Sequence, residues 1–288
     1  MAFFKSILFT AFFVLISTTC FSQDSKNSEE ENQANKIFNE GNSFLKKNQY
    51  AEAIAQYEQA ISIYGKAARY YYNLAVAYRR LNDFEKAISA LKKAVEADPS
   101  FSQSYNLLGK SYEQVGKTAD AIAIYQKGIE TVPDEQDNYI SIGRAYIAAK
   151  KYNDAAKNLK KAIELQPKDV FAYYYLGIAY SENSNQEEAV ATFKKGTEVD
   201  PKNDEVFLRL GMAYNELGKF ELAFDAIQKS VELKKGSANR KGANYYELGR
   251  SLKGLGKFTE AKSAFKNAKT DASWSRNADY QLDLLKNK

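Results

Sequence analysis

Apolar and small side chains recur along most of this 288-residue chain at steps of three and four residues. Tyr105, Leu108 and Tyr112 follow this spacing in one segment, and the segment that comes after it repeats the pattern. Such steps place the side chains on one face of an amphipathic helix. They predict a helix from Ser102 to about Val115 and a second from about Thr118 to Val132.

Turn-forming residues separate the predicted helices. Glycine followed by lysine stands between the two helices of a pair at Gly116, Gly218 and Gly256, where glycine suits the left-handed end of a helix. The pairs themselves end on proline, which cannot continue a helix, at Pro99, Pro133, Pro167 and Pro201. The pattern therefore predicts consecutive helix pairs joined by short turns.

The pairs repeat with a period of 34 residues. Two aromatic columns keep this step, namely Tyr71, Tyr105, Tyr139, Tyr173 and Phe207, and Tyr78, Tyr112, Tyr146, Tyr180 and Tyr214. An alanine column holds it at Ala53, Ala87, Ala121, Ala155, Ala189 and Ala223, and continues at Ala261 after a four-residue insertion. The columns divide the chain into seven units, 34–67, 68–101, 102–135, 136–169, 170–203, 204–237 and 242–275. Because aromatic residues at helical spacing usually pack in the interior, we expect Tyr173 and Tyr180 to be part of the scaffold.

A small-residue column adds a packing expectation. Its members are Gly41, Ala75, Gly109, Gly143, Gly177, Gly211 and Gly249. We expect these residues to lie opposite the alanine column, so that paired helices approach closely. One helix pair cannot bury its apolar face alone, so neighbouring pairs must stack to stabilise the chain.

Taken together, the columns resemble the tetratricopeptide repeat family. One unit carries the pattern as Tyr105, Leu108-Gly109, Tyr112, Ala121, Tyr125, Gly128 and Pro133. The resemblance implies an all-α fold, a right-handed superhelical solenoid of seven helix-turn-helix units, with a concave groove lined mostly by the first helix of each unit. Such proteins bind protein or peptide partners, so the resemblance implies a binding function.

Two columns of the first helices should face that groove. They supply an apolar patch whose members are Ile140, Tyr174, Ile178, Leu208 and Met212, joined at one side by Ile147 and Phe171. Arg144 is the cation that we single out beside the patch. A contiguous exposed apolar surface with a polar rim favours a partner site. The alternatives are that the repeats merely tolerate apolar residues there, or that the superhelix closes over its own surface.

The first residues predict export. A lysine at Lys5 precedes an apolar run from Ile7 to Ile16, which is too short for a spanning helix and is typical of a secretory signal peptide. We predict a signal peptide over 1–22, cleaved after Ser22, then a disordered polar spacer over 23–33 and a soluble, exported protein, most simply periplasmic. The alternatives are a lipid anchor on Cys20 and an uncleaved membrane anchor.

Near the C-terminus the sequence predicts an insertion and a cap. The insertion, residues 238–241, lies in a basic stretch between the sixth and seventh units and is predicted to lengthen that connection. At the end of the chain, Trp274, Ala278, Leu282 and Leu285 share one helical face. A capping helix over 276–288 would seal the apolar edge of the last unit.

The composition argues against catalysis and cofactors. Histidine is absent and Cys20 is the only cysteine, which removes the commonest general base, metal ligands and thiolate chemistry. We identify no glycine-rich phosphate loop, and the acidic residues do not converge. The formal charge of +5 is mild for a nucleic-acid partner. We therefore expect no enzyme, cofactor or metal, but a protein-interaction scaffold of the bacterial cell envelope, or alternatively a structural assembly factor that uses its convex face or its cap.

Overall fold

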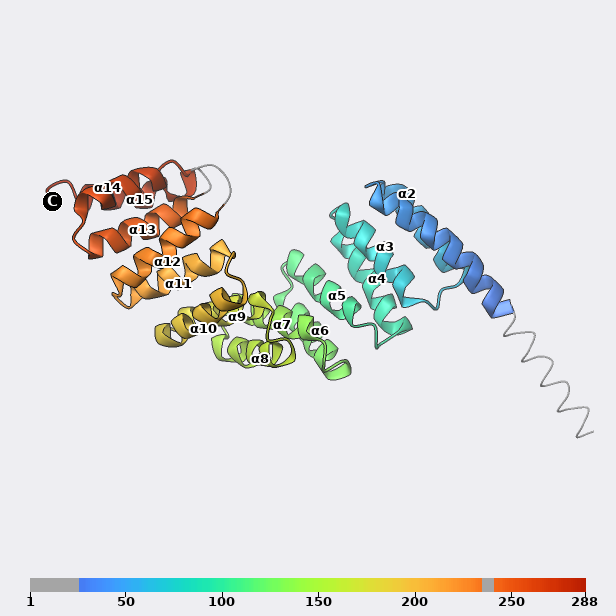
Figure 1. Ribbon diagram of the computed structural model, residues 1–288. Helices are drawn as coiled ribbons and strands as arrows, with labels where there is room; N and C mark the ends of the chain where they lie inside the picture. Colours follow the sequence, from blue (N-terminus) through green and yellow to red (C-terminus); the bar gives the residue numbers. More distant parts are fainter. Residues whose placement is uncertain (1–25, 235–240) are drawn as a thin grey trace, which may run out of the picture. The chain divides into compact units, whose positions relative to one another are not determined.

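The computed structural model describes residues 26–234 and 241–288, and these residues form an all-helical chain (Figure 1). Residues 26–46 are helical, and the helices that follow are α2 (Tyr50–Ile63), α3 (Ala68–Arg80), α4 (Phe84–Ala97), α5 (Ser102–Gln114), α6 (Thr118–Thr131), α7 (Gln136–Ala148), α8 (Tyr152–Leu165), α9 (Val170–Glu182), α10 (Gln186–Val199), α11 (Asp204–Glu216), α12 (Phe220–Leu233), α13 (Gly242–Gly254), α14 (Phe258–Ala268) and α15 (Ala272–Leu284). The predicted fold class, an all-α repeat solenoid, is confirmed.

Contacts between helices divide the chain into two compact units, each of which contains several of the 34-residue repeats. From here on, the first unit is the part that ends at Pro133 and the second unit is the part that begins at Asp134. In each unit, every helix from α2 onward packs against the next helix along the chain. In the second unit the first helices of successive pairs also touch one another, so that α7 contacts α9, α9 contacts α11 and α11 contacts α13. These first helices therefore form a continuous layer within that unit.

The turn inside each pair places one residue in the left-handed backbone region. Three of these residues are the predicted glycines, with φ of 75° at Gly116, 68° at Gly218 and 73° at Gly256. The equivalent positions of other pairs are left-handed without glycine, and they are Asn48, Asn82, Lys150 and Ser184. The geometry of the pair thus imposes this conformation whatever the residue.

Glycines of the first helices allow the two helices of a pair to approach closely. A Cβ atom built on Gly177 would lie 2.4 Å from Phe193 Cε1, and one on Gly109 would lie 2.3 Å from Tyr125 Cε1. The partners of this column are therefore the large side chains of the second helices, not the alanines that we expected. At Gly109 and Gly177 an aromatic ring of the second helix occupies the space that a side chain would take.

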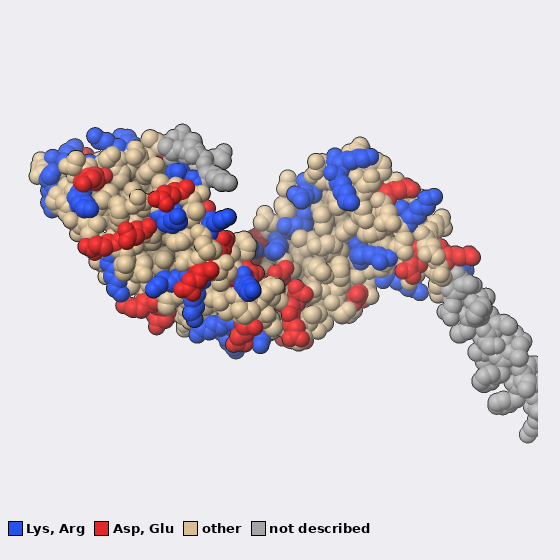
Figure 2. All heavy atoms as spheres, in the orientation of Figure 1, with Lys and Arg blue, Asp and Glu red and all other residues tan. Residues whose placement is uncertain are grey.

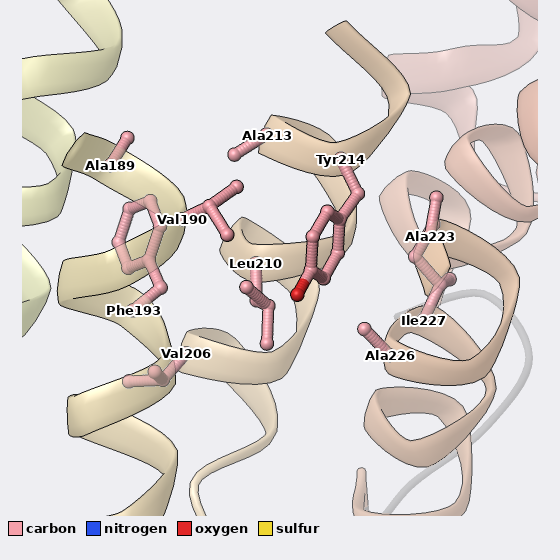
Figure 3. Close-up of a cluster of buried hydrophobic side chains, with 10 residues drawn as sticks. All are labelled: Ala189, Val190, Phe193, Val206, Leu210, Ala213, Tyr214, Ala223, Ala226 and Ile227. Carbon is pink, nitrogen blue, oxygen red and sulfur yellow. The ribbon is translucent and has the colours of Figure 1, made fainter. Parts of the chain in front are cut away.

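Buried apolar side chains join successive pairs into one core. In the second unit, Val190 and Phe193 of α10, Leu210 of α11 and Ile227 of α12 belong to one buried cluster, with α10 on one side of α11 and α12 on the other (Figure 3). Because α11 packs between the second helices α10 and α12, the pair that it belongs to does not bury its apolar face alone.

The ends of the chain differ in part from the prediction. Residues 26–33, expected as a disordered spacer, are helical and continue without a break into the first repeat helix. Arg69 holds this extension through an ion pair of 3.8 Å to Glu31 and a hydrogen bond of 2.6 Å to Asn35. At the other end, α15 begins at Ala272, before the predicted boundary at 276, and packs Ala278, Leu282 and Leu285 against α13 and α14.

Some of the predictions lie outside the described residues. These are the signal peptide over 1–22 with Cys20, residues 23–25 of the spacer, and residues 238–240 of the insertion. Lys241, the last residue of that insertion, is described, and its Nζ donates a hydrogen bond of 2.9 Å to the carbonyl of Val231.

Candidate functional site

The predicted groove residues lie on α7, α9 and α11, all within the second unit. On α9, Phe171, Tyr174 and Ile178 follow a three- and four-residue spacing, and they lie on a different face from Gly177, which meets Phe193 of α10. Ile140 of α7 corresponds to Tyr174 in the repeat, and Met212 of α11 corresponds to Ile178. Ile147 lies seven residues after Ile140, about two turns further along α7. Because α7, α9 and α11 contact one another in turn, these faces form one surface, which we call the first-helix surface.

Phe171 is the most prominent apolar group of the first-helix surface. Its side chain is 59% exposed, although a phenylalanine is usually buried. Ile140, Ile147, Ile178 and Met212 are each partly exposed. The prediction that Leu208 belongs to this surface is wrong, because Leu208 is only 4% exposed. The surface therefore centres on α9 and α7 more than on α11.

Tyr174 is held in place by two charged residues of α11. Its hydroxyl donates to Glu205 Oε1 at 3.4 Å and accepts from Arg209 Nη2 at 3.5 Å. The guanidinium carbon of Arg209 lies 5.8 Å from the centre of the Tyr174 ring, and Arg209 Nε is 3.6 Å from Glu205 Oε1. Burial raises the pKa of Tyr174, and the positive charge of Arg209 partly offsets this effect. The Tyr174 hydroxyl is therefore engaged within the chain, and the ring helps to fix α9 to α11.

Two residues of this surface were not predicted. Tyr175 packs edge-on to Tyr174 with ring centres 5.1 Å apart, and it also packs against the buried cluster between α8 and α9. Arg209, described above, forms the polar rim on the α11 side. A four-residue step from Phe171 leads to Tyr175, so helical spacing alone could have found it.

The predicted cation Arg144 lies on α7 between Ile140 and Ile147, half-buried. It interacts with a neighbouring group of the chain, as do Asp137 and Ser141 of the same helix. Arg144 therefore adds a partly satisfied cation to the edge of the first-helix surface.

A buried polar network joins α11 to α13 further along the layer of first helices. Glu247 is only 3% exposed, and its carboxylate accepts from Asn215 Nδ2 at 3.0 Å and from Arg250 Nη1 at 3.1 Å. Arg250 Nη2 also donates to Glu216 Oε1 at 2.9 Å. Burial raises the pKa of Glu247, although Arg250 and Asn215 favour the charged form. This network is structural in character, since its groups satisfy one another.

Over residues 26–234 and 241–288, no group of three or more potential metal ligands comes together. Across the same residues, no helix combines the length and hydrophobicity needed to cross a membrane. On the face drawn in Figure 2, basic and acidic side chains are interspersed within each unit.

Comparison with known families identifies the repeat. Family models described as tetratricopeptide repeat match residues 38–100, 74–137, 172–203, 204–236 and 243–270, and one described as TPR repeat matches residues 143–184. The chain belongs to the tetratricopeptide repeat family. A search of curated proteins gives no match.

Solved structures of repeat proteins are similar to this one. The C-terminal part of a TPR repeat-containing protein from Cytophaga hutchinsonii is 22% identical with a TM-score of 0.67, covering 85% of this chain and 99% of that one. MamA is 28% identical with a TM-score of 0.52, covering 56% and 94%. YrrB, titled a TPR protein with an unusual peptide-binding site, is 24% identical with a TM-score of 0.52, covering 62% and 92%. These similarities support a TPR fold.

Proposed function

We propose that this protein is a non-enzymatic interaction scaffold that binds a peptide segment or helix of a partner protein on its first-helix surface. The tetratricopeptide repeat fold generally serves protein interaction, and a similar structure, YrrB, carries a peptide-binding site by its title. The observation that carries the proposal is the exposed ring of Phe171, on the same face of α9 as the partly exposed Ile178 two turns further along.

The chemistry of the surface suggests how it would bind. Aromatic side chains and arginine are the commonest anchors of protein interfaces, and this surface offers Phe171, Tyr175 and the rim residue Arg209. Tyr174 is already held by Glu205 and Arg209, so the surface is preformed on rigid helices. A partner would therefore lose little affinity to ordering of this chain.

A matched pair of variants tests the proposal. Phe171→Glu replaces the most exposed ring of the first-helix surface by a charge, whereas Leu222→Glu places the same charge on α12, where Leu222 is 48% exposed. Both variants should keep the parent's helical circular dichroism, because neither side chain is buried. We expect a partner captured from cell-envelope extract by the parent and by Leu222→Glu to be lost with Phe171→Glu.

The captured partner then has to bind as a purified protein. We expect its affinity to fall by about tenfold or more with Phe171→Glu, which corresponds to about 1.4 kcal/mol. Equal affinity for the two variants would refute binding on this surface.

We also propose that the chain acts in the cell envelope after export. The basis is the order of charged, apolar and small residues over 1–22. Mass spectrometry of the protein from its native cells tests this directly. The expected result is an N-terminus at Gln23. An acylated Cys20 would mean that the exported protein is anchored by a lipid and is not soluble. An intact Met1 would contradict export with cleavage.

A further inference from the structure

Each of the two compact units carries a cleft over the first helix of one pair, between that helix and the two second helices that flank it. In the second unit a cleft of about 360 Å³ lies over α9, between α8 and α10, and its lining includes Ile163, Tyr173, Leu176, Tyr180 and Lys195. In the first unit a cleft of about 240 Å³ lies over α3, between α2 and α4, lined in part by Ile61, Tyr71, Leu74, Tyr78 and Lys93. We call these the tyrosine clefts.

The two clefts are copies of one another in the repeat. Their corresponding residues lie 102 residues apart, which is three repeat lengths, as with Tyr71 and Tyr173 or Lys93 and Lys195. Small residues occupy the same wall position in both, Ser89 on α4 and Ala191 on α10. The two units therefore build similar clefts with matching tyrosines, leucines and small residues, and each cleft has a lysine at the matching position on its second helix.

Hydrogen bonds within the chain hold three of the tyrosine rings that line the clefts. Tyr173 Oη donates to the carbonyl of Pro167 at 3.1 Å, and Tyr71 Oη donates to the equivalent carbonyl of Gly65 at the same distance. Tyr78 Oη donates to Glu58 Oε1 at 2.8 Å. Three of the four cleft tyrosines therefore turn their hydroxyls to partners within the chain, and their ring surfaces are left to line the space.

The clefts are also cationic. Lys86 lies over the Tyr78 ring at 5.4 Å, and Lys160 lies over the Tyr180 ring at 5.7 Å, although the two lysines come from opposite walls. Lys93 and Lys195 make no ion pair or hydrogen bond with any described residue.

The carboxylates in the clefts already have partners. Glu58 accepts from Tyr78, and Glu164 lies 3.2 Å from Lys161. Each cleft therefore presents an apolar floor and an ammonium group without a counter-charge.

We propose that the tyrosine clefts are a second protein-binding site, which takes a bulky apolar side chain of an acidic peptide segment. The apolar side chain would fill the space above Leu74 or Leu176, and a neighbouring carboxylate would pair with Lys93 or Lys195. Cavities that hold whole small molecules measure about 300–1,000 Å³. The cleft of about 240 Å³ is smaller than this range and the cleft of about 360 Å³ lies at its lower end, so each has room for one bulky side chain. The site lies on a different face of α9 from Phe171, so it is separate from the first-helix surface.

An array of eight-residue peptides provides the probe. Each peptide has a central Phe, Leu or Ala that is flanked by Glu, by Lys or by neutral residues, and the purified full-length chain is applied to it. We expect binding to the peptides with Phe or Leu between glutamates, and little binding to those with Ala or with lysines.

Three double variants then locate the binding. Lys93→Glu with Lys195→Glu reverses the unpaired charges, and Ser89→Leu with Ala191→Leu fills both clefts at exposed positions. The matched control, Lys92→Glu with Lys194→Glu, makes the same charge change one residue away, outside the lining. We expect the first two double variants to bind the acidic peptides at least tenfold more weakly, and the control to bind like the parent.

Other results would overturn the proposal. Equal loss in the control would show general charge attraction, and a preference for neutral or basic peptides would contradict the cationic clefts. Displacement of the peptides by decanoate at equal affinity would assign the clefts to an amphipathic small acid instead. Phe171→Glu should bind the array like the parent, so that failure here is distinguishable from failure of the first-helix surface.

Discussion

At the scale of single residues, the turn inside each helix pair requires one residue with a left-handed backbone conformation. In several pairs that residue is not a glycine. Lys150 and Ser184 adopt φ of 58° and 62°, where a side chain beyond Cα costs roughly 1–2 kcal/mol. Gly116 and Gly218 satisfy the same turn without that cost. The repeat therefore stores a small strain at particular pairs.

Replacing Lys150 by glycine should relieve this strain. We expect Lys150→Gly to raise the free energy of unfolding by up to about 1 kcal/mol, because relief of the left-handed strain outweighs the greater freedom of glycine in the unfolded chain. Urea denaturation followed by circular dichroism measures the change. Gly116→Ala is the converse control and should destabilise, since a Cβ there meets nothing within 4 Å and only the backbone is affected. A loss of stability in Lys150→Gly would contradict this account of the turn.

Between two paired helices, the glycine of the first helix decides how closely they pack. Alanine normally stabilises a helix interior by about 1 kcal/mol over glycine, yet Gly177→Ala would place its Cβ 2.4 Å from Phe193. We expect this overpacking to destabilise the chain by about 1–3 kcal/mol, measured by the same denaturation experiment. Adding Phe193→Leu should recover part of the loss, because the smaller side chain makes room. Stabilisation by Gly177→Ala alone would show that α9 and α10 separate easily.

Between neighbouring pairs, the buried Glu247 makes stability depend on pH. Burial raises its pKa above the usual value of 4.5, so the folded chain binds this proton more tightly than the unfolded chain does. The stabilisation that comes from protonating Glu247 is therefore fully present below the pKa of this residue in the unfolded chain. It is lost as the pH rises through the pKa of Glu247 in the folded chain.

Glu247→Gln removes this titration while keeping an acceptor for Asn215 and Arg250. Between about pH 4 and 7, we expect the melting temperature of the parent to fall relative to that of Glu247→Gln as the pH rises. Thermal unfolding of both proteins across this range provides the measurement. A constant difference in melting temperature would mean that Glu247 titrates normally.

These elements also show what the sequence can predict. The 34-residue columns reveal the helix pairs, because every repeat must solve the same packing problem with similar residues. Leu208 was assigned to the surface from its column, whereas α11 turns that side chain into the interior. Glu247 replaces the Arg209 of the previous repeat, and its burial depends on Asn215 and Ser251, which no single column reveals. The environment of residues that depart from the repeat pattern can therefore be found only from the structure.

At the scale of the whole molecule, the repeats should respond to damage locally. Each helix of the array packs mainly on its neighbours along the chain, so stability is close to a sum of local terms. Gly177→Ala should accordingly speed amide hydrogen exchange most in α9 and α10, less in α8 and α11, and leave α3 and α4 of the first unit as in the parent. Hydrogen exchange with mass spectrometry resolves these segments.

The converse variant sharpens the test. Gly109→Ala makes the equivalent clash with Tyr125 in the first unit, 2.3 Å from Cε1. It should speed exchange in α5 and α6 while leaving α11 to α14 unchanged. If either variant instead accelerates exchange uniformly from α3 to α14, the chain unfolds as one cooperative body, and the local picture of its stability is wrong. Local behaviour would mean that a partner on the first-helix surface stabilises chiefly the helices that it touches, because binding energy reaches only the repeats coupled to the site.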